Sequence, residues 1–440
     1  MKIRILFGST FLLSAVLMFI LFGSQKSKNK LAEAENPSYR LIVSTDIGGT
    51  DPDDFQSMIH LLLYADVLDI EGLISSPYGP GREKHILQVI DQYEIDYPNL
   101  KNYSDKYPTA DSLRKITKQG ETEVAGHTGF GKTTEGSDWI VQCARRDDPR
   151  PLFVLIWGGI EDLAQALHDA PDIMTRLRVY FIGGPNKKWS PNAYQYIADN
   201  FPGLWIIESN ATYRGWFTGG NQEGEWGNSV FTERFINGKG ALGEFFTTKL
   251  GGTIKMGDTP SLAWLLNSRN PEDPTLPCWG GQYVRAWERP YYLFDRMPSI
   301  NDSVQSFSIL EIALSTNGDL PENPKAFLSV ENQSLNGSIS EDGIVKFRFS
   351  PKSAKMFNFK VESNISSIDG KAGNIKAYIP SAELVNQPSE KYPNWWTDNP
   401  APELAEGEHI GAKTVSRWRK EFLKDFAERL ERCTTYRNEK

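Results

Sequence analysis

The sequence has few cysteines, and this scarcity limits the kinds of site that the chain can hold. Only Cys143, Cys278 and Cys433 occur in 440 residues. Three cysteines cannot all pair, and their spacing matches no metal-binding motif. A disulfide between Cys278 and Cys433 is one interpretation, but three buried or partly buried thiols are the favoured one. A cysteine-based metal centre is therefore not expected.

The chain also lacks the basic surface that a nucleic-acid partner requires. Its 48 basic and 56 acidic residues give a net charge of −8, and no lysine- or arginine-rich stripe offsets this balance. Hydrophobic residues make up 39% and charged residues 24%, as in ordinary globular proteins. The length predicts about two to three domains. We therefore expect a globular protein with no nucleic-acid partner.

The first residues have the layout of an export signal. Lys2 and Arg4 precede an apolar run from Ile5 to Phe22, and a polar stretch follows. Residues 1–30 are therefore predicted to be a signal peptide, with an uncleaved membrane anchor as the alternative. No cysteine follows the run, which excludes a lipid-modified cysteine there. The folded part is expected outside the cytoplasm, either in the periplasm or in the extracellular medium. If the anchor is not cleaved, the folded part is held at the outer side of the membrane, and the anchor is its only expected membrane contact.

Residues 37–295 alternate short apolar strands with stretches of helical periodicity. The strands are predicted at 40–45, 68–75, 152–157, 179–182 and 204–208, and the helices between them at 55–64, 84–93 and 160–168. This alternation is typical of an α/β fold, with a mostly parallel sheet and helices on both faces. Ligands of such sheets bind beyond the carboxyl ends of the strands. The loops at those ends are thus the expected site.

The remainder of the chain has a different pattern. Residues 300–385 contain short strands separated by Gly, Asn, Ser and Pro, which predicts a small antiparallel β-sandwich-like domain. Residues 386–440 are predicted to form a linker rich in Pro and Trp and then a C-terminal helix over 413–432. The apolar stripe of that helix indicates that it packs back on the main domain.

An acidic loop follows the first strand. Asp46, Asp51, Asp53 and Asp54 lie within nine residues, interspersed with glycines that allow a tight turn. Four ionised carboxylates this close repel one another unless a cation is present. Hard oxygen ligands in a flexible loop suit calcium best and magnesium next. The alternative is a solvated acidic turn in which Asp53 caps the following helix.

The order of several segments resembles that of the nucleoside hydrolases, which implies a Rossmann-type, nucleoside-hydrolase-like sheet. The similar segments run from residue 38 to 290: Thr45–Asp54, Glu71–Ser76, Trp157–Ala164, Ile182–Pro185, Ala193–Asp199 and Gly257–Ala263. A closer resemblance is to the nucleoside-hydrolase-like family named for a cellulose-binding protein of polysaccharide-degrading bacteria. It rests on four segments: Ser44–Asp54, Thr212–Gly215, Trp279–Tyr283 and Trp418–Ala427.

The resemblance implies roles for four aspartates of the site but none for Asp51. Asp46 would bind the metal and activate a water as general base, and Asp54 would be a bidentate metal ligand. Asp53 would hold a sugar hydroxyl. The backbone carbonyl of Trp157 and the carboxylate of Asp258 would complete the ligands of a Ca²⁺ ion. The implied chemistry is attack of water on an anomeric carbon with oxocarbenium character.

Three departures from the nucleoside hydrolases bear on activity. About three extra residues lie between Asp46 and Asp53, among them Asp51. Gly257 stands where many nucleoside hydrolases have a histidine that helps the leaving base depart. His127 is the candidate catalytic substitute, and the alternative is a structural role, which is more common for a lone histidine in a Gly-rich loop. The sugar-binding segment has Ala193 and Gln195 in place of Glu and Asn. The metal site is thus better supported than nucleoside specificity.

Aromatic and basic residues near the expected loops suggest further contacts with substrate. Trp157 and Trp279 are candidates for stacking on a sugar ring, and burial in the core is the alternative. Gln195 is a candidate for hydrogen bonding to substrate. Arg214, in the Thr212–Gly215 segment, is predicted either to bind an anionic sugar or carboxylate or to form a structural salt bridge.

Two functions remain open at this point. The first is a calcium-dependent hydrolase of N- or O-glycosidic bonds that acts on carbohydrate or nucleoside substrates, including polysaccharide-derived material. The second is a non-catalytic carbohydrate-binding protein on a degenerate nucleoside hydrolase scaffold. The aspartate set favours the first, and the missing histidine favours the second.

Overall fold

A computed structural model describes residues 38–77 and 79–434. The expected signal peptide or anchor, residues 1–30, lies outside the described residues. Within those residues, none of the helices has both the length and the apolar character needed to cross a bilayer. The three cysteines are buried and unpaired, in agreement with the favoured interpretation of the sequence.

The main sheet has eight strands within the described residues. They are β1 (Arg40–Thr45), β2 (Asp69–Ser75), β3 (Thr117–Gln119), β4 (Leu152–Ile156), β5 (Leu177–Ile182), β6 (Ile206–Ser209), β7 (Tyr283–Arg285) and β17 (Trp395–Asp398). Their order is β3-β2-β1-β4-β5-β6-β17-β7, and only β7 runs antiparallel to its neighbour. The predicted α/β fold with a mostly parallel sheet is therefore confirmed.

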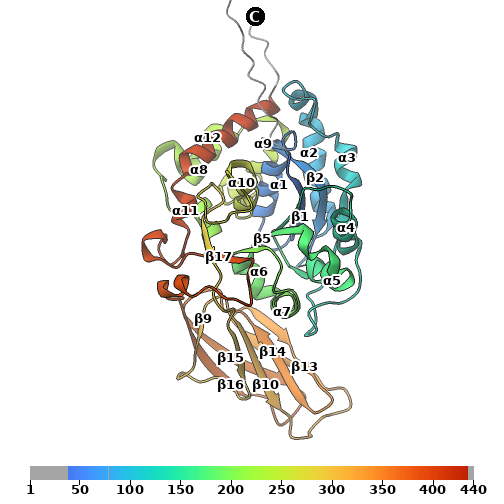
Figure 1. Ribbon diagram of the computed structural model, residues 1–440, viewed down its shortest axis with the longest axis vertical. Coiled ribbons are helices and arrows are strands. Elements are labelled where there is room, and N and C mark those ends of the chain that lie inside the picture. The colour runs from blue at the N-terminus through green and yellow to red at the C-terminus, as the bar shows by residue number, and fades with distance from the viewer. Residues whose placement is uncertain (1–37, 78, 435–440) are drawn as a thin grey trace, which may run out of the picture. The chain divides into compact units, whose positions relative to one another are not determined.

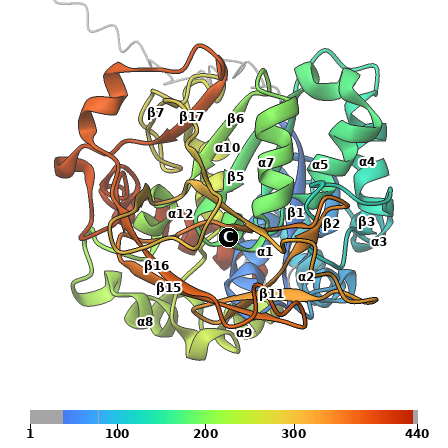
Figure 2. The same ribbon diagram turned by 90° about the horizontal axis from the view of Figure 1, so that it is seen from below.

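Helices cover both faces of this sheet (Figure 2). Strand β1 is buried throughout, and its side chains alternate between two hydrophobic clusters, Leu41 and Val43 in one and Ile42 in the other. The first cluster packs against α1 (Asp53–Leu63), α2 (Glu83–Lys101), α9 (Gly240–Thr247), α10 (Thr259–Asn267) and α12 (Arg419–Leu430). The second packs against α4 (Glu135–Ala144), α5 (Glu161–Asp169) and α7 (Pro191–Asn200). Burial on both faces explains why these strands are continuous apolar runs.

Shorter helices complete the connections. They are α3 (Ala110–Lys115), α6 (Gly183–Trp189), α8 (Asn228–Phe231), α11 (Lys413–Ser416), the π-helix η4 (Thr232–Ile236) and the 3₁₀ helices η1 (Pro171–Arg176), η2 (Thr212–Trp216), η3 (Gly224–Trp226), η5 (Leu250–Gly252), η6 (Ala382–Asn386), η7 (Pro402–Leu404) and η8 (Glu431–Cys433).

The strand order determines where a ligand would bind. From β1 the chain proceeds outward through β2 and β3, and then returns to the other side of β1 with β4. The order therefore reverses between β1 and β4, whose carboxyl ends lie side by side in register. In open parallel sheets a crevice forms outside the strand ends at such a reversal. The loops that follow β1 and β4 begin at Asp46 and Trp157.

Two further sheets enclose a third hydrophobic cluster. One has the order β13-β14-β10-β8 and the other β12-β11-β15-β16-β9. Their strands are β8 (Tyr291–Phe294), β9 (Ser303–Gln305), β10 (Ile309–Ser315), β11 (Ala326–Val330), β12 (Gln333–Asn336), β13 (Ser338–Ile339), β14 (Ile344–Phe349), β15 (Met356–Ser363) and β16 (Ala372–Tyr378). Most pairs are antiparallel, as predicted, but β8 and β9 pair in parallel with β10 and β16.

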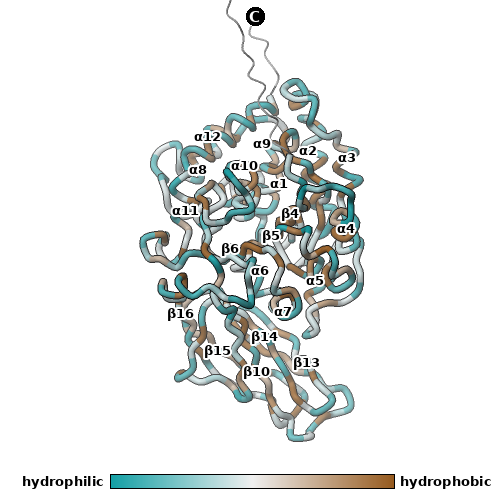
Figure 3. The backbone as a smooth tube through the Cα atoms, in the orientation of Figure 1, coloured by the Kyte–Doolittle hydropathy of each residue, from teal (hydrophilic) through white to brown (hydrophobic). Residues whose placement is uncertain are grey.

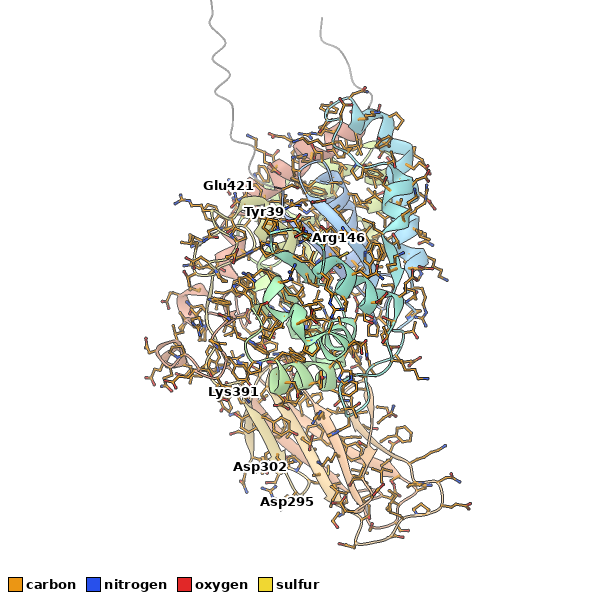
Figure 4. The ribbon with its side chains drawn as sticks, turned by 45° about the vertical axis from the view of Figure 1, so that its right-hand side comes forward. Tyr39, Arg146, Asp295, Asp302, Lys391 and Glu421 are labelled. Atoms are coloured by element: carbon orange, nitrogen blue, oxygen red, sulfur yellow. The ribbon has the colours of Figure 1, made fainter. Side chains whose placement is uncertain are left out.

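Side chains in these sheets alternate between core and solvent. Every second residue of β14 and β15 is buried, and both sheets contribute to the shared cluster. The alternation is visible as changing hydropathy along the strands (Figure 3). Asp295 and Asp302 lie on this part of the chain, and Lys391 lies where the chain leaves it (Figure 4).

The C-terminal region differs from its prediction in two respects. Residues 395–398, interpreted as part of a linker, form β17, which pairs in parallel with β6 inside the main sheet. The sequence pattern hides this strand because it is short and follows a proline-rich segment. The predicted helix over 413–432 is divided into α11 and α12, with Phe422 and Phe426 of α12 buried in the first cluster (Figure 1).

A buried carboxylate fixes β17 to the main sheet. Asp398, 1% exposed, accepts hydrogen bonds from the backbone N–H groups of Asn210, Ala211 and Thr212. These donors belong to the loop that follows β6. One side chain from the end of the chain thus satisfies three backbone donors at the ligand-binding edge of the sheet.

Replacing Asp398 by alanine should therefore destabilise the fold. Three buried N–H groups would lose their acceptor, and we expect a loss of at least about 3 kcal/mol in the free energy of unfolding. Urea unfolding followed by circular dichroism measures the change. The exposed Asp105→Ala variant is the control, and a loss for Asp398→Ala below about 1 kcal/mol would contradict the assignment.

Candidate metal centre

Four aspartates converge at the point where the strand order reverses. Asp46 follows β1, Asp53 and Asp54 begin α1, and Asp258 directly precedes α10. One carboxylate oxygen from each of Asp53, Asp54 and Asp258 lies within 4.8 Å of the other two. The carboxyl of Asp46 is close enough to this group that, after burial, the charge of Asp53 contributes to its raised pKa. Carboxylates more than 200 residues apart in sequence therefore share one site.

Polar side chains on α1 hold the distant loop in place. The Gln56 amide donates to the carbonyl of Thr253 at 2.9 Å and accepts from the backbone N–H groups of Lys255 and Met256. The Ser57 hydroxyl accepts from the N–H of Asp258 at 3.3 Å. The helix that begins with Asp53 and Asp54 therefore also positions Asp258.

The loop after β4 approaches Asp46 closely. A Cβ at Gly158 would lie 2.6 Å from the backbone nitrogen of Asp46, so only glycine fits there. The indole of the preceding Trp157 donates to Ser261 of α10 at 2.6 Å. The carbonyl of Trp157 accepts from the Asn186 amide at 3.1 Å, which leaves a second lone pair for another partner.

Burial and mutual repulsion disfavour ionisation of this cluster. Burial, followed by the charge of Asp53, raises the pKa of Asp46 to about 8. Burial also raises the pKa of Asp53 to about 7. The pKa values of Asp54 and Asp258 are raised well above their usual range by burial and then by neighbouring aspartates. Proton uptake or a bound cation would each relieve this repulsion.

A lysine partly compensates the cluster at its rim. The Lys255 ammonium forms an ion pair with Asp51 and lies 3.4 Å from Asp53. Asp53 also accepts from the N–H of Gly257 at 2.9 Å. Asp51, the inserted aspartate for which the resemblance implies no role, therefore anchors Lys255. Asp54 and Asp258 are not in an ion pair with any cation among the residues that the structure describes.

These residues fit a divalent cation. The Oδ2 atom of Asp258 is buried and has no hydrogen-bond partner among the described residues, and the same holds for the Ser76 hydroxyl next to Gly158. An unpaired buried carboxylate oxygen carries a large free-energy cost unless a cation coordinates it. The donors are all oxygen atoms, the ligand type that hard cations prefer. The Asp53, Asp54 and Asp258 cluster can thus hold a metal ion.

Comparison with known families agrees with this arrangement. Residues 40–283, more than half of the chain, match the family described as the nucleoside hydrolase-like domain of cellulose-binding Sde182. The chain belongs to this family. The match includes β1 to β6, the acidic loop and Asp258, and thus the whole aspartate cluster of the nucleoside hydrolase-like domain.

Solved structures with related folds share little sequence with this nucleoside hydrolase-like chain. A nucleoside hydrolase-related protein from Saccharophagus degradans that is associated with carbohydrate metabolism is 19% identical, with a TM-score of 0.48 over 78% of this chain and 100% of its own. A purine-preferring ribonucleoside hydrolase from Gardnerella vaginalis is 11% identical, with a TM-score of 0.42 over 89% and 99%. Curated proteins gave no match.

The candidate catalytic histidine is engaged elsewhere in the nucleoside hydrolase-like chain. His127 lies 2.8 Å from the carboxylate of Glu311 in β10, and its carbonyl accepts from Arg348 of β14. No aspartate of the cluster is among these partners. His127 therefore joins the loop before α4 to the antiparallel sheets, and the proposal of a catalytic role has no support from its contacts.

Three other candidate residues also have structural partners. The Gln195 amide donates to Asp199 on its own helix, and both residues line a surface pocket beside Tyr392 that contains none of the four aspartates. The indole of Trp157 is 1% exposed and cannot stack on a sugar. Trp279 is partly buried against the first cluster. Of the predicted substrate-binding residues, only Asp53 lies within the cluster.

Steric contact with Asp53 explains why residue 257 of the nucleoside hydrolase-like domain is a glycine. A Cβ at this position would lie 2.4 Å from Oδ2 of Asp53, the atom that accepts a hydrogen bond from the N–H of Gly257. A histidine at this position would displace that carboxylate. The missing histidine and the position of Asp53 are therefore parts of one arrangement.

Lys255, Gln56 and Ser57 belong to the site but were not inferred from the sequence. The only sequence signal for Gln56 and Ser57 is that two polar residues interrupt the apolar face of a helix that proves buried throughout. Lys255 is three residues from Asp258, but nothing in the sequence indicates that it lies beside Asp51.

The stability of the metal-free protein should fall as pH rises. Unfolded aspartates ionise near pH 3.8, whereas Asp53 and Asp46 in the fold hold their protons to about pH 7 and pH 8. The folded state therefore binds more protons, and its stability decreases between about pH 4 and pH 8. Calcium should reverse the loss. Thermal unfolding with EDTA or calcium measures both effects, and an equal calcium response from Asp258→Asn would contradict the site.

Removing the hydrogen bonds of Gln56 to residues 253–256, the Gln56 clamp, should weaken metal binding without removing a ligand. Gln56→Leu frees the loop that carries Asp258, and we expect calcium affinity to fall about tenfold or more. Calorimetric titration of the metal-free protein measures the affinity. Gln142→Leu, on the exposed surface of α4, is the matched control. Unchanged affinity in Gln56→Leu would show that the clamp does not position Asp258.

Proposed function

We propose that the protein is a calcium-dependent hydrolase of glycosidic bonds, either N- or O-glycosidic. The observation that carries this proposal is the convergence of Asp46, Asp53, Asp54 and Asp258 at the reversal point of the sheet. Membership of the nucleoside hydrolase-like family supports the reaction class. The description of that family as cellulose-binding supports carbohydrate-derived substrates, with nucleosides as the alternative.

Calcium suits the donors better than a softer metal. All four side chains are carboxylates, and the carbonyl of Trp157, in the loop that approaches Asp46, offers a further oxygen. Calcium accepts six to eight oxygen ligands in flexible geometry, and carboxylates bind it in one- or two-oxygen modes. Asp54, with Thr45 donating to one of its oxygens, is the proposed bidentate ligand.

The proposed chemistry gives each residue a separate task. A divalent cation supplies Lewis acidity toward water and toward adjacent sugar hydroxyls. Asp46, which is partly exposed, is placed to take a proton from an attacking water. Lys255 opposes the effect of burial on Asp53 and favours its ionised form, which can accept a hydrogen bond from a sugar hydroxyl. The nearby negative charge stabilises oxocarbenium character at the anomeric carbon.

A carbohydrate-binding protein without catalysis is the second candidate. The observation that favours it is that neither proposed acid is available: position 257 is glycine, and His127 pairs with Glu311. A leaving group that needs protonation would then leave slowly. Export, with the fold outside the cytoplasm, remains part of both proposals and rests on the sequence of residues 1–30.

Asp46→Asn should abolish hydrolysis if the first proposal holds. The amide cannot take the proton of the attacking water, and we expect at least about a hundredfold loss of rate. The measurement is turnover of a panel of nitrophenyl glycosides and nucleosides, each with calcium and with EDTA. The exposed Asp105→Asn is the matched control.

The outcomes separate the two candidates. Calcium-dependent turnover that Asp46→Asn removes and Asp105→Asn retains supports the hydrolase. If no substrate is turned over while oligosaccharides bind to the calcium-loaded protein, the binding protein is the correct assignment. Turnover that persists in EDTA would contradict the proposed role of the cation.

A further inference from the structure

One arginine of the Thr212–Gly215 segment has no acidic partner. The guanidinium of Arg214 stacks on the ring of Tyr213, 5.4 Å from its centroid. Within residues 38–77 and 79–434, it forms no ion pair and donates no hydrogen bond. By contrast, buried Arg40 pairs with Glu71 and Arg289 with Glu208, and buried Arg419 donates to the carbonyls of Trp216 and Trp226. The structural salt bridge that the sequence left open for Arg214 is therefore absent.

Arg214 lines a cavity formed by three separate segments. Its volume is about 150 Å³, and its wall includes Arg214 after β6, Ser306, Lys352 and Ser353 from the antiparallel sheets, and Glu408 and His409 from the loop before α11. This volume is below that of pockets for drug-sized ligands, which begin at about 300 Å³. The cavity therefore suits a small molecule or the end group of a longer one.

The charges around this cavity are unbalanced. Burial and then the charge of Lys188 lower the pKa of Lys352, the charge of Glu331 opposes them, and Arg214 lowers it further. Lys188 and Lys355 share Glu331 as their partner, so this carboxylate is already taken. Glu408, exposed to solvent, is the one carboxylate in the wall of the cavity. Arg214 and Lys352 thus face the cavity with little compensation.

A series of side-chain contacts links the cavity to the aspartate cluster. The ring of buried Tyr213 lies 6.2 Å from that of Phe217, centroid to centroid, and the Lys255 ammonium lies 5.8 Å from the Phe217 centroid. Lys255 is in turn 3.4 Å from Asp53, so Tyr213, Phe217 and Lys255 connect Arg214 with the candidate metal centre. Both follow carboxyl ends of strands in the same sheet, β6 for Arg214 and β1 for Asp46.

The backbone of the cavity wall is held in an uncommon conformation. Phe307 has a φ of 63°, in the left-handed region that bulky residues rarely occupy. Its N–H donates to Pro351 at 2.6 Å, and its carbonyl accepts from Lys187 at 3.1 Å. Such conformations cost free energy and concentrate at sites that bind ligands. Here Ser306 and Phe307 line the same cavity as Arg214.

We propose that this cavity binds the carboxylate or phosphate group of a small anionic sugar. Arg214 offers paired N–H donors in the planar geometry that matches either oxyanion. Lys352 adds a second positive charge, and the hydroxyls of Ser306 and Ser353 are available to the sugar. Neutral hexoses lack the group that Arg214 and Lys352 recognise. The inference deepens the proposed function, and rests on it, by assigning acidic sugars as the substrate class.

Binding can be measured apart from hydrolysis. The calcium-loaded full chain is titrated calorimetrically with glucuronate, glucose 6-phosphate and neutral glucose. We expect both anionic sugars, or one of them, to bind at least about tenfold more tightly than glucose. The anionic sugar that binds more tightly shows whether the cavity prefers a carboxylate or a phosphate. Arg214→Ala should remove this preference, and Arg214→Lys should retain part of it. Arg145, an exposed arginine that directly follows α4, provides the control, and Arg145→Ala should leave the preference unchanged.

Calcium titration of the same variants separates this inference from the proposed function. Arg214→Ala should bind calcium as the unmodified chain does, because it touches none of the aspartates. Equal affinity for glucose and the anionic sugars, or a preference that survives Arg214→Ala, overturns the anion site whatever the result for calcium. Loss of calcium binding in the unmodified chain overturns the metal proposal and leaves the sugar preference as an independent result.

Discussion

Repulsion among four closely placed aspartates is the constraint on which the site depends. Asp53, Asp54 and Asp258 are buried and Asp46 is partly exposed, and among the described residues Lys255 alone forms an ion pair with one of them. A fold gains nothing from such a cluster unless protons or a cation neutralise it. The unpartnered oxygen of Asp258 and the clamp formed by Gln56 and Ser57 indicate a site that is built to bind a cation. The family match extends over all of these residues.

The rest of the chain supports this edge of the sheet from several directions. Asp398, near the C-terminus, organises the loop after β6 that leads to Arg214. Glu311 and Arg348 of the antiparallel sheets hold His127 in the loop before α4. The antiparallel sheets thus contact the main domain through this loop, and Lys352 and Ser353 line the cavity that also contains Arg214.

Local pattern was sufficient to predict the parallel sheet and the aspartates. The apolar run from Arg40 to Thr45 predicts a buried strand, and the carboxylates after it indicate a metal-binding loop. The pattern failed where tertiary contacts decide the structure. Strand β17 is four residues long and forms only because Trp395 and Trp396 fill the two opposite clusters. His127 was assigned by elimination, and its partner Glu311 is 184 residues away, beyond the reach of any local signal.

The central claim is that these carboxylates share one divalent cation at the reversal point of the sheet. Its most direct test is a crystal structure of the full chain prepared with calcium, with anomalous diffraction data to identify the metal. The account predicts a peak bounded by Asp46, Asp54, Asp258 and the carbonyl of Trp157, and its loss in an Asp258→Asn crystal. Well-defined aspartates with only water between them under the same conditions would contradict it.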